Sequence, residues 1–196
     1  NTMITDGASE IPYSFHNKLI KASSFETDIP LGFWRAVFNS QNAFANECFI
    51  DELAEQLKID PIDLRLQYLG SNSRPSIIIR KVAKQAKWGS NLPKGHYQGF
   101  AYHHSFGTHV AQIAEISIDK SNQIKVHKVS SSIDCGQTVN PMTIRAQIQG
   151  SIIFGLGATI KSEIVTPYIS VEKDEARISV RIKDSLENLR RNDLIN

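Results

Sequence analysis

The residues best suited to chemistry lie in one segment that follows Asn140-Pro141. Pro141 can open a helix that the Asn140 side chain caps, and glycines follow at positions 150, 155 and 157. A glycine has no side chain to hold a neighbour away, so this helix permits the close approach of a ligand or of another backbone. Gln147, on the same helix, carries an amide that both donates and accepts hydrogen bonds.

Histidines and a serine form a second candidate group, His103-His104-Ser105. Adjacent residues on a strand point to opposite faces, so His103 and His104 cannot easily share one metal ion, and we expect no metal site. Ser105 beside these histidines is the only basis for a hydrolase, and no Gly-x-Ser-x-Gly elbow supports it. An esterase-like activity remains the alternative function.

Carboxylates and cysteines carry weaker signals. Glu47 and Asp51-Glu52 lie within a helical pattern and are interpreted as a solvated face or as structural caps rather than as acids and bases. Cys48 lies in an apolar helical run and is predicted to be a small buried hydrophobe. Cys135, in the turn Asp134-Cys135-Gly136, is either structural or close to a cofactor. The two cysteines fit neither a zinc spacing nor a disulfide framework.

Three helices are expected before these groups. Ser40 can cap the first, whose stripe is Phe44, Cys48, Ile50, Leu53, Ala54 and Leu57. Asp60 caps the second and Pro61 opens it; that helix carries Leu64, Leu66, Tyr68 and Leu69. The third covers about 76–87, with Lys81, Lys84 and Lys87 on a solvated face.

A hairpin is expected between the third helix and the glycine-bearing helix. Residues 110–118 read as a largely buried strand, 119–123 as a polar turn, and 124–129 alternate as the return strand. The sheet needs further strands to be stable. Helices followed by an antiparallel hairpin and a glycine-bearing helix predict an α+β fold.

Composition is that of an ordinary globular protein. Of the 196 residues, 41% are hydrophobic and 21% charged, and the net charge is +2. The charge gives no reason to expect nucleic acid as a partner. No apolar run approaches the roughly 18 to 20 residues that span a bilayer. These features leave the compartment of the parent protein unknown.

Two segments resemble the large, molybdopterin-binding subunit of molybdenum hydroxylases of the xanthine dehydrogenase and aldehyde oxidase type. The first is Gly32-Phe33-Trp34-Arg35, then Ser-Gln-Asn-Ala-Phe-Ala at 40–45 and Asp-Glu-Leu-Ala at 51–54. Its Gly-Phe-Trp-Arg form resembles the isoquinoline 1-oxidoreductase branch. The second comprises Asp134-Cys135-Gly136, Asn140-Pro141, Gln147, Gly150, Gly155 and Gly157. Residues 106–111 between them also look like the family, and the likeness runs from about 7 to 163.

The resemblance implies a cofactor-binding role for one set of residues: Arg35, Gln41, Gly107, Asp134, Gly136, Asn140, Gln147 and Gly150. Gln147 suits a pterin edge or an oxygen ligand of the metal. Backbone N–H groups at a helix start suit a pyrophosphate. Residues 36–39 depart from the glycine-rich loop of the wider family, which leaves a structural ion pair open for Arg35; helix-start hydrogen bonding is the alternative for Gln41. No catalytic residue is assigned.

The family's reaction is the hydroxylation of an aldehyde or nitrogen heterocycle, with water as the oxygen source and an iron–sulfur subunit as the electron path. Its cofactor is molybdopterin, here expected as the cytosine dinucleotide. The family's catalytic glutamate lies in a Gly-Glu-Pro-Pro-like segment that these residues do not contain; Glu163 is not in that context. We therefore expect this polypeptide, by itself, to bind molybdopterin weakly or not at all and to have no hydroxylase activity.

The ends of the chain differ from its body. Residues 1–6 resemble the leader of a β-galactosidase fusion in cloning vectors, and 165–196 read as a divergent or non-native tail. Residues 7–164 are then part of a molybdopterin-binding domain. A domain cut from a larger fold exposes apolar faces, so a homo-oligomer or a non-catalytic self-associating module is a further alternative.

Overall fold

A three-stranded antiparallel sheet, ordered β1-β2-β3, forms the centre of this computed structural model, which describes residues 2–23 and 32–162. The strands are β1 (His96–Ser105), β2 (Thr108–Ile118) and β3 (Ile124–Asp134). Before them come η1 (Thr2–Thr5), α1 (Asn39–Leu57), α2 (Pro61–Gln67) and α3 (Arg74–Ala86). After them come α4 (Pro141–Leu156) and a π-helical turn, η2 (Gly157–Lys161). The predicted α+β class is confirmed.

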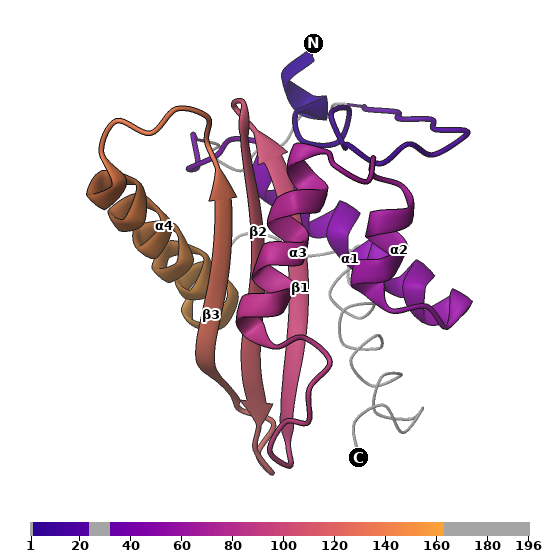
Figure 1. Ribbon diagram of the computed structural model, residues 1–196. Helices are drawn as coiled ribbons and strands as arrows, with labels where there is room; N and C mark the ends of the chain where they lie inside the picture. Colours follow the sequence, from indigo (N-terminus) through magenta and orange to yellow (C-terminus); the bar gives the residue numbers. More distant parts are fainter. Residues whose placement is uncertain (1, 24–31, 163–196) are drawn as a thin grey trace, which may run out of the picture.

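The layers are arranged around this sheet (Figure 1). Helix α3 lies across one face, α1 and α2 lie beside β1, and α4 passes behind β3. The hairpin predicted from residues 110–129 is confirmed as β2 and β3, and β1 supplies the further strand that the pair needs. Phe106 and Gly107 join β1 to β2 with φ values of 49° and 71°, as in the two-residue turn that matches strand twist.

Local signals explain where the helices begin, with one exception. The Asp60 carboxylate accepts hydrogen bonds from the N–H groups of Ile62 and Asp63, as predicted. Helix α3 begins two residues before the predicted 76, because Ser73 caps it. Helix α2 ends at Gln67, so the predicted members Tyr68 and Leu69 lie beyond it.

Ser40 is the exception, and its predicted role as a cap is wrong. Helix α1 already begins at Asn39, and the residue at the cap position, Phe38, makes no side-chain cap bond. The Ser40 hydroxyl instead donates to the carbonyl oxygen of Val37. The physical reason is the tight turn before the helix, which places Asn39 in helical geometry one residue early.

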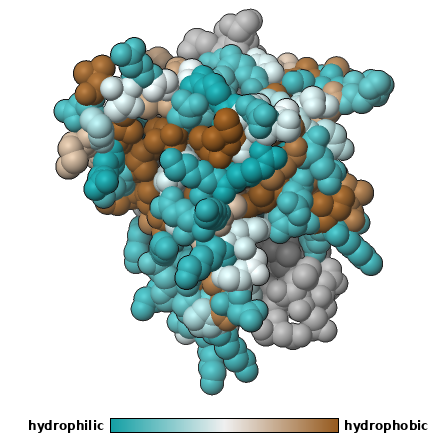
Figure 2. Space-filling model, viewed as in Figure 1, coloured by the Kyte–Doolittle hydropathy of each residue, from teal (hydrophilic) through white to brown (hydrophobic). Residues whose placement is uncertain are grey.

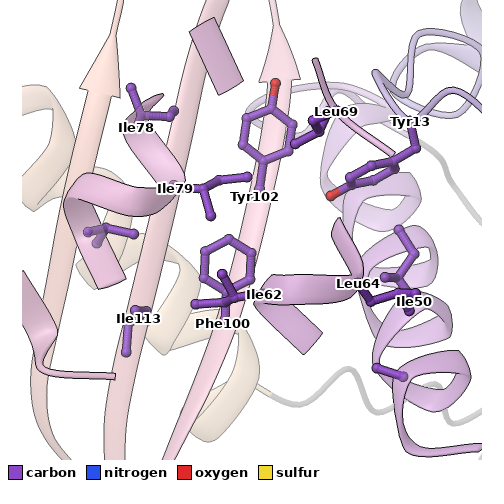
Figure 3. Packing of buried hydrophobic residues seen from close by; sticks show 13 residues of the cluster. Tyr13, Ile50, Ile62, Leu64, Leu69, Ile78, Ile79, Phe100, Tyr102 and Ile113 are labelled. Atoms are coloured by element: carbon purple, nitrogen blue, oxygen red, sulfur yellow. The ribbon is translucent and has the colours of Figure 1, made fainter. Parts of the chain in front are cut away.

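The hydrophobic core lies between the sheet and the first three helices (Figure 3). Ile79 of α3 points toward Tyr102 of β1, and Tyr13 reaches α1 from the N-terminal segment. The buried residues of this core are Tyr13, Ile50, Ala54, Ile62, Leu64, Leu69, Ile78, Ile79, Val82, Phe100, Tyr102, Ala111 and Ile113.

Helix α1 buries a different face from the predicted one. Phe44, Cys48 and Leu57 of the predicted stripe are exposed, whereas Glu47 is buried beside Ile50 and Ala54. The interpretation of Cys48 as a buried hydrophobe is therefore wrong. The cause is a set of hydrogen bonds that makes burial of Glu47 favourable, described below. On α3, by contrast, Lys81 and Lys84 are exposed as predicted, and so is Lys87, directly after the helix.

Helix α4 is poorly covered by the rest of the described chain. None of its residues is buried, although the helix is rich in isoleucine and carries Met142 and Phe154. Ile144, Ile148, Ile152 and Leu156, which recur every four residues, are its half-buried stripe. On the face of the molecule shown in Figure 2, hydrophobic residues gather in the upper half of the molecule, and hydrophilic residues surround the lower ends of the strands. Over residues 2–23 and 32–162, no helix has the length and hydrophobicity needed to cross a bilayer.

Candidate functional site

The structure brings two of the predicted cofactor residues together, although 112 positions separate them. A guanidinium nitrogen of Arg35 donates to the side-chain oxygen of Gln147 at 3.2 Å. Arg35 belongs to the loop before α1, and Gln147 belongs to α4. Both side chains are exposed, so their polar groups remain accessible to a ligand.

An aromatic contact joins the same two segments. The rings of Trp34 and Phe154 lie with centroids 5.2 Å apart, and the Arg35 guanidinium carbon lies 5.8 Å from the Phe154 centroid. Both distances are within the usual range for ring pairs and for cation–π contacts. The loop therefore meets α4 through Trp34 and Arg35 together.

The turn behind Arg35 has an unusual backbone. Ala36 and Val37 have φ values of 72° and 51°, a region that favours glycine and disfavours a β-branched residue. The Val37 N–H donates to the Trp34 carbonyl oxygen, and the Asn39 N–H donates to that of Ala36. Ala36 and Val37 therefore take backbone conformations typical of glycine although neither residue is a glycine.

The glycines of the α4 region face open space. A Cβ built on Gly150, Gly155 or Gly157 would meet no heavy atom within 4 Å beyond its own local backbone. Packing of α4 therefore does not require these glycines, which leaves their surface free for the close approach of a ligand. Gln41, in the first turn of α1, is exposed, and its side-chain oxygen accepts from the Ser40 hydroxyl at 3.0 Å.

The start of α4 is already capped from within. The Asn140 side-chain oxygen accepts from the N–H groups of Met142 and Thr143, at 3.0 and 3.3 Å. Two of the donors that a helix start could offer to a pyrophosphate are thus occupied in this structure. The exposed amide of Gln147 and the surface beside Gly150 are the more accessible parts of the helix.

A second group of predicted residues meets at the end of the sheet where β2 begins and β3 ends. The Asp134 carboxylate accepts from two guanidinium nitrogens of Arg74, at 2.7 and 2.9 Å, and from the Gly136 N–H at 3.0 Å. Arg74 also donates to the carbonyl oxygen of Gly107 at 3.5 Å. The hydrogen bonds from Arg74 and the Gly136 N–H hold the pKa of Asp134 far below its ordinary value. Arg74 was not predicted, because nothing in the sequence around it marks its partner.

The histidines divide between the two faces of the sheet, as predicted. His103 Nε2 contacts the side-chain oxygen of Asn39 at 2.9 Å, whereas His104 stacks on His109 with centroids 4.3 Å apart. The Tyr102 hydroxyl contacts His109 Nδ1 at 2.6 Å. Burial, followed by the nearby His104, lowers the pKa of His109. Among the residues described, no group of three or more histidine, cysteine or acidic side chains is arranged to hold a metal ion.

Ser105 lacks the partner that would make it a nucleophile. It pairs with Thr108 at the end of the β1–β2 hairpin. No hydrogen bond joins its hydroxyl to a histidine within residues 2–23 and 32–162.

Glu47 is the centre of a buried charged cluster. Its carboxylate accepts from Arg65 Nε at 3.0 Å, from the Tyr102 N–H at 2.8 Å and from the Tyr13 hydroxyl at 2.8 Å. Arg65 also donates to Asp51 at 2.6 Å and is fully buried. Burial raises the pKa of Glu47, against the opposing charge of Arg65. Every side chain of the cluster is used to join α1, α2, β1 and the N-terminal segment, so the interpretation of Glu47 as structural agrees with the structure, whereas a solvated position does not.

A shallow hollow of about 210 Å³ lies between α1 and residues of β1 and β2. Its lining includes the exposed Phe44 and Cys48 of α1, and Ala101, Val110 and Gln112 of the strands. The residues that the α1 pattern placed in the core therefore border an open surface instead.

Comparison with known proteins covers most of the chain. A family model described as the molybdopterin cofactor-binding domain matches residues 36–168. The beta subunit of isoquinoline 1-oxidoreductase from Brevundimonas diminuta is 28% identical over 158 residues, which are 79% of this chain and 20% of that protein. A subunit of nicotinate dehydrogenase from Pseudomonas putida is 27% identical over 177 residues, 81% of this chain and 15% of that protein.

A third relative is the membrane-bound aldehyde dehydrogenase (pyrroloquinoline-quinone) of Gluconacetobacter polyoxogenes, 25% identical over 174 residues, 78% of this chain and 22% of that protein. The matched part of the chain thus spans between 15% and 22% of the length of these relatives. The matched region includes the turn that follows Arg35, the elements α1 to α4 and the Arg74–Asp134 pair.

Proposed function

Because this chain belongs to the molybdopterin cofactor-binding domain family, we propose that it supplies part of the molybdenum–pterin site of an oxidoreductase. The Arg35–Gln147 pair carries the proposal, since it joins the two resembling segments at an exposed place beside an open glycine surface. Gln147 would hold the polar edge of the pterin, and Arg35 would bring a positive charge to it. Gly150 would let the cofactor lie against the helix backbone.

The cofactor, when bound, supplies the hydroxylation chemistry with water as the oxygen source. The residues of this chain bind and orient it. Asp134 and Arg74 neutralise each other and fix the end of β3, from which the chain enters α4. Gln41, Gly107, Gly136 and Asn140 stay predicted cofactor contacts, and the cytosine dinucleotide stays the predicted form.

The substrate class is proposed from the names of the relatives. Two of the relatives are named after a nitrogen heterocycle, isoquinoline or nicotinate, and the third is named an aldehyde dehydrogenase. We propose one of these two classes for the parent enzyme, with an iron–sulfur subunit as its partner. The chain alone is proposed to be inactive, and stoichiometric molybdenum with hydroxylase activity in the purified chain would contradict this.

A chimera tests the binding role directly. Residues 7–164 of this chain would replace the matched segment of the Brevundimonas diminuta protein, expressed with its partner subunit. We expect the chimera to retain molybdenum and pterin, and Gln147→Ala or Arg35→Ala to lower their content about tenfold, the loss of one hydrogen bond to a charged or polar ligand. Phe49→Leu, at an exposed position of α1, is the control.

Two results would defeat the proposal. One is a folded chimera, judged by its thermal transition, that carries no molybdenum. The other is a molybdenum content that does not respond to changes at Arg35 and Gln147.

Self-association is the second candidate function, and one observation favours it. Large apolar side chains are exposed on α4 and on the loop before α1, among them Phe33, at 94% exposure, and Met142 and Ile153. Light scattering of the purified chain measures its mass in solution. A monomer at micromolar concentration would exclude this candidate.

The hydrolase alternative gains no support, because Ser105 has no histidine partner among the residues that the structure describes. An esterase assay of Ser105→Ala against the unchanged chain tests it. We expect no difference between the two, and a serine-dependent activity would revive this alternative.

A further inference from the structure

Phe154 occupies the place where the loop before α1 meets α4. The centroid of its ring lies 5.2 Å from that of Trp34 and 5.8 Å from the guanidinium carbon of Arg35. Phe154 follows Gln147 by seven residues, which is about two turns of helix, so the two side chains share one face of α4. The hydrogen bond and the ring contacts therefore hold the same loop at two heights along the helix.

We propose that Phe154 is a positioning residue, which holds the Trp34-Arg35 loop on α4 so that the Arg35 guanidinium is presented to Gln147. The inference rests on the proposed function only for the identity of the ligand, the pterin cofactor, that the Arg35–Gln147 pair would contact. The positioning of Arg35 by Phe154 is a property of this chain alone.

The hydrogen bond by itself is not enough to fix Arg35. It is single, 3.2 Å long and exposed, so water competes with Gln147 for the guanidinium. The turn that follows has positive φ at Ala36 and Val37, which opposes this loop conformation. The loop therefore needs a further contact, and the ring of Phe154 provides it from α4.

The two contacts of Phe154 are complementary in chemistry. The face of an aromatic ring attracts a cation, and a second ring can pack against its face or its edge; neither contact uses a hydrogen-bonding group of Arg35. The guanidinium keeps its remaining donors for a ligand. An aliphatic side chain of similar size would fill the space and would provide neither the ring pair nor the cation–π contact.

Trp34 provides a direct readout, because the chain contains only Trp34 and Trp88. In a Trp88→Phe background, acrylamide quenching reports the exposure of Trp34 alone. We expect Phe154→Leu to raise the quenching constant about twofold and Phe154→Tyr to leave it close to the starting value, because only the aromatic variant preserves the ring pair. Phe49→Leu, another exposed phenylalanine replaced by leucine, is expected to change nothing.

The Arg35 side chain is followed by its Nε–H signal in a nitrogen-15 NMR spectrum, assigned with Arg35→Lys. Phe154→Leu is expected to move this signal toward its position in Gln147→Ala, and Phe154→Tyr is expected to leave it unchanged. Should Trp88→Phe prevent folding, the Trp34 indole signal, assigned with Trp34→Phe, replaces the quenching measurement in the unaltered chain.

The positioning role is refuted if Phe154→Leu leaves both the Trp34 and Arg35 signals unchanged, or if Phe49→Leu moves them equally. None of these measurements involves the cofactor. If the molybdenum content of the chimera does not change on substitution of Arg35 or Gln147, the proposed function fails and the positioning role stands. If the NMR and quenching signals do not change in Phe154→Leu, the positioning role fails and the proposed function stands.

Discussion

Two arginines of this protein have similar partners and opposite surroundings. Arg65 lies 5.0 Å from the centroid of Phe100 and hydrogen-bonds to Glu47, whereas Arg35 lies 5.8 Å from that of Phe154 and hydrogen-bonds to Gln147. Arg65 is fully buried with its donors used, and Arg35 is exposed with one side-chain hydrogen-bond partner in the described part of the chain. The donors of a buried, paired arginine are engaged within the fold, whereas an exposed arginine keeps donors for a ligand.

The space around the glycines of these two regions, the one around Glu47 and the one around α4, differs in the same way. Gly7, next to α1, is buried with a φ of +80°, and a Cβ there would lie 2.8 Å from the Asn39 side-chain oxygen. A Cβ on Gly150 of α4 would have no such neighbour within 4 Å. The part of the chain around Glu47 is thus closed, while the α4 part is open.

The largest expected effect is at the buried arginine. Arg65→Met leaves Glu47 buried without its charged partner, so we expect a loss of about 3–5 kcal/mol in the free energy of unfolding, measured in urea. Adding Glu47→Gln should recover about 1–2 kcal/mol, because a neutral amide removes the unpaired charge and still accepts from the Tyr102 N–H. Arg35→Met, the matched change at the exposed site, should cost less than about 1 kcal/mol. Equal losses at the two arginines would abolish the contrast.

The next effect is at Gly7. An alanine side chain would be strained by the positive φ and would press on Asn39, whose side chain also binds His103. We expect Gly7→Ala to lower the free energy of unfolding by about 2–3 kcal/mol. Urea denaturation measures it, and an unchanged midpoint would show that Gly7 does not pack against Asn39 as described.

Gly150→Ala should act in the opposite direction. Alanine is about 0.5–1 kcal/mol more favourable than glycine inside an exposed helix, so the isolated chain should become more stable by that amount. In the chimera, the same change should reduce molybdenum content, because the added methyl group occupies the surface that the cofactor would approach. A destabilised chain would mean that the helix packs against something at this position.

The smallest effect concerns pH and the Asp134–Arg74 pair. Since the folded pKa of Asp134 lies below its ordinary value of 3.8, the contribution of the pair is present above the unfolded pKa and is lost as pH falls through the folded one. Melting temperatures of the unchanged chain and of Asp134→Asn should therefore differ at pH 6 and converge as the pH falls well below 4. Curves that stay parallel down to acid pH would rule out the linkage.

Local sequence signals were enough for the elements whose ends are fixed by their own residues. Asp60-Pro61 and Asn140-Pro141 mark helix starts that the structure confirms, since a capping side chain bonds to N–H groups two or three residues away. An apolar run marked β2 and alternation marked β3, and the α+β class followed from the order of the elements. The motifs around Arg35 and Gln147 also gave the family, because they occur in its order.

Only the tertiary structure decided which face of α1 is buried and which predicted residues meet. Hydrophobicity placed Cys48 and Phe44 inside, yet Glu47 lies there, because Arg65, Tyr102 and Tyr13 come from distant parts of the chain to satisfy its carboxylate. The contact of Arg35 with Gln147, and that of Arg74 with Asp134, likewise join residues 112 and 60 positions apart. Capping and alternation act over a few residues and leave a mark in the sequence, whereas such long-range pairings depend on how the whole chain packs.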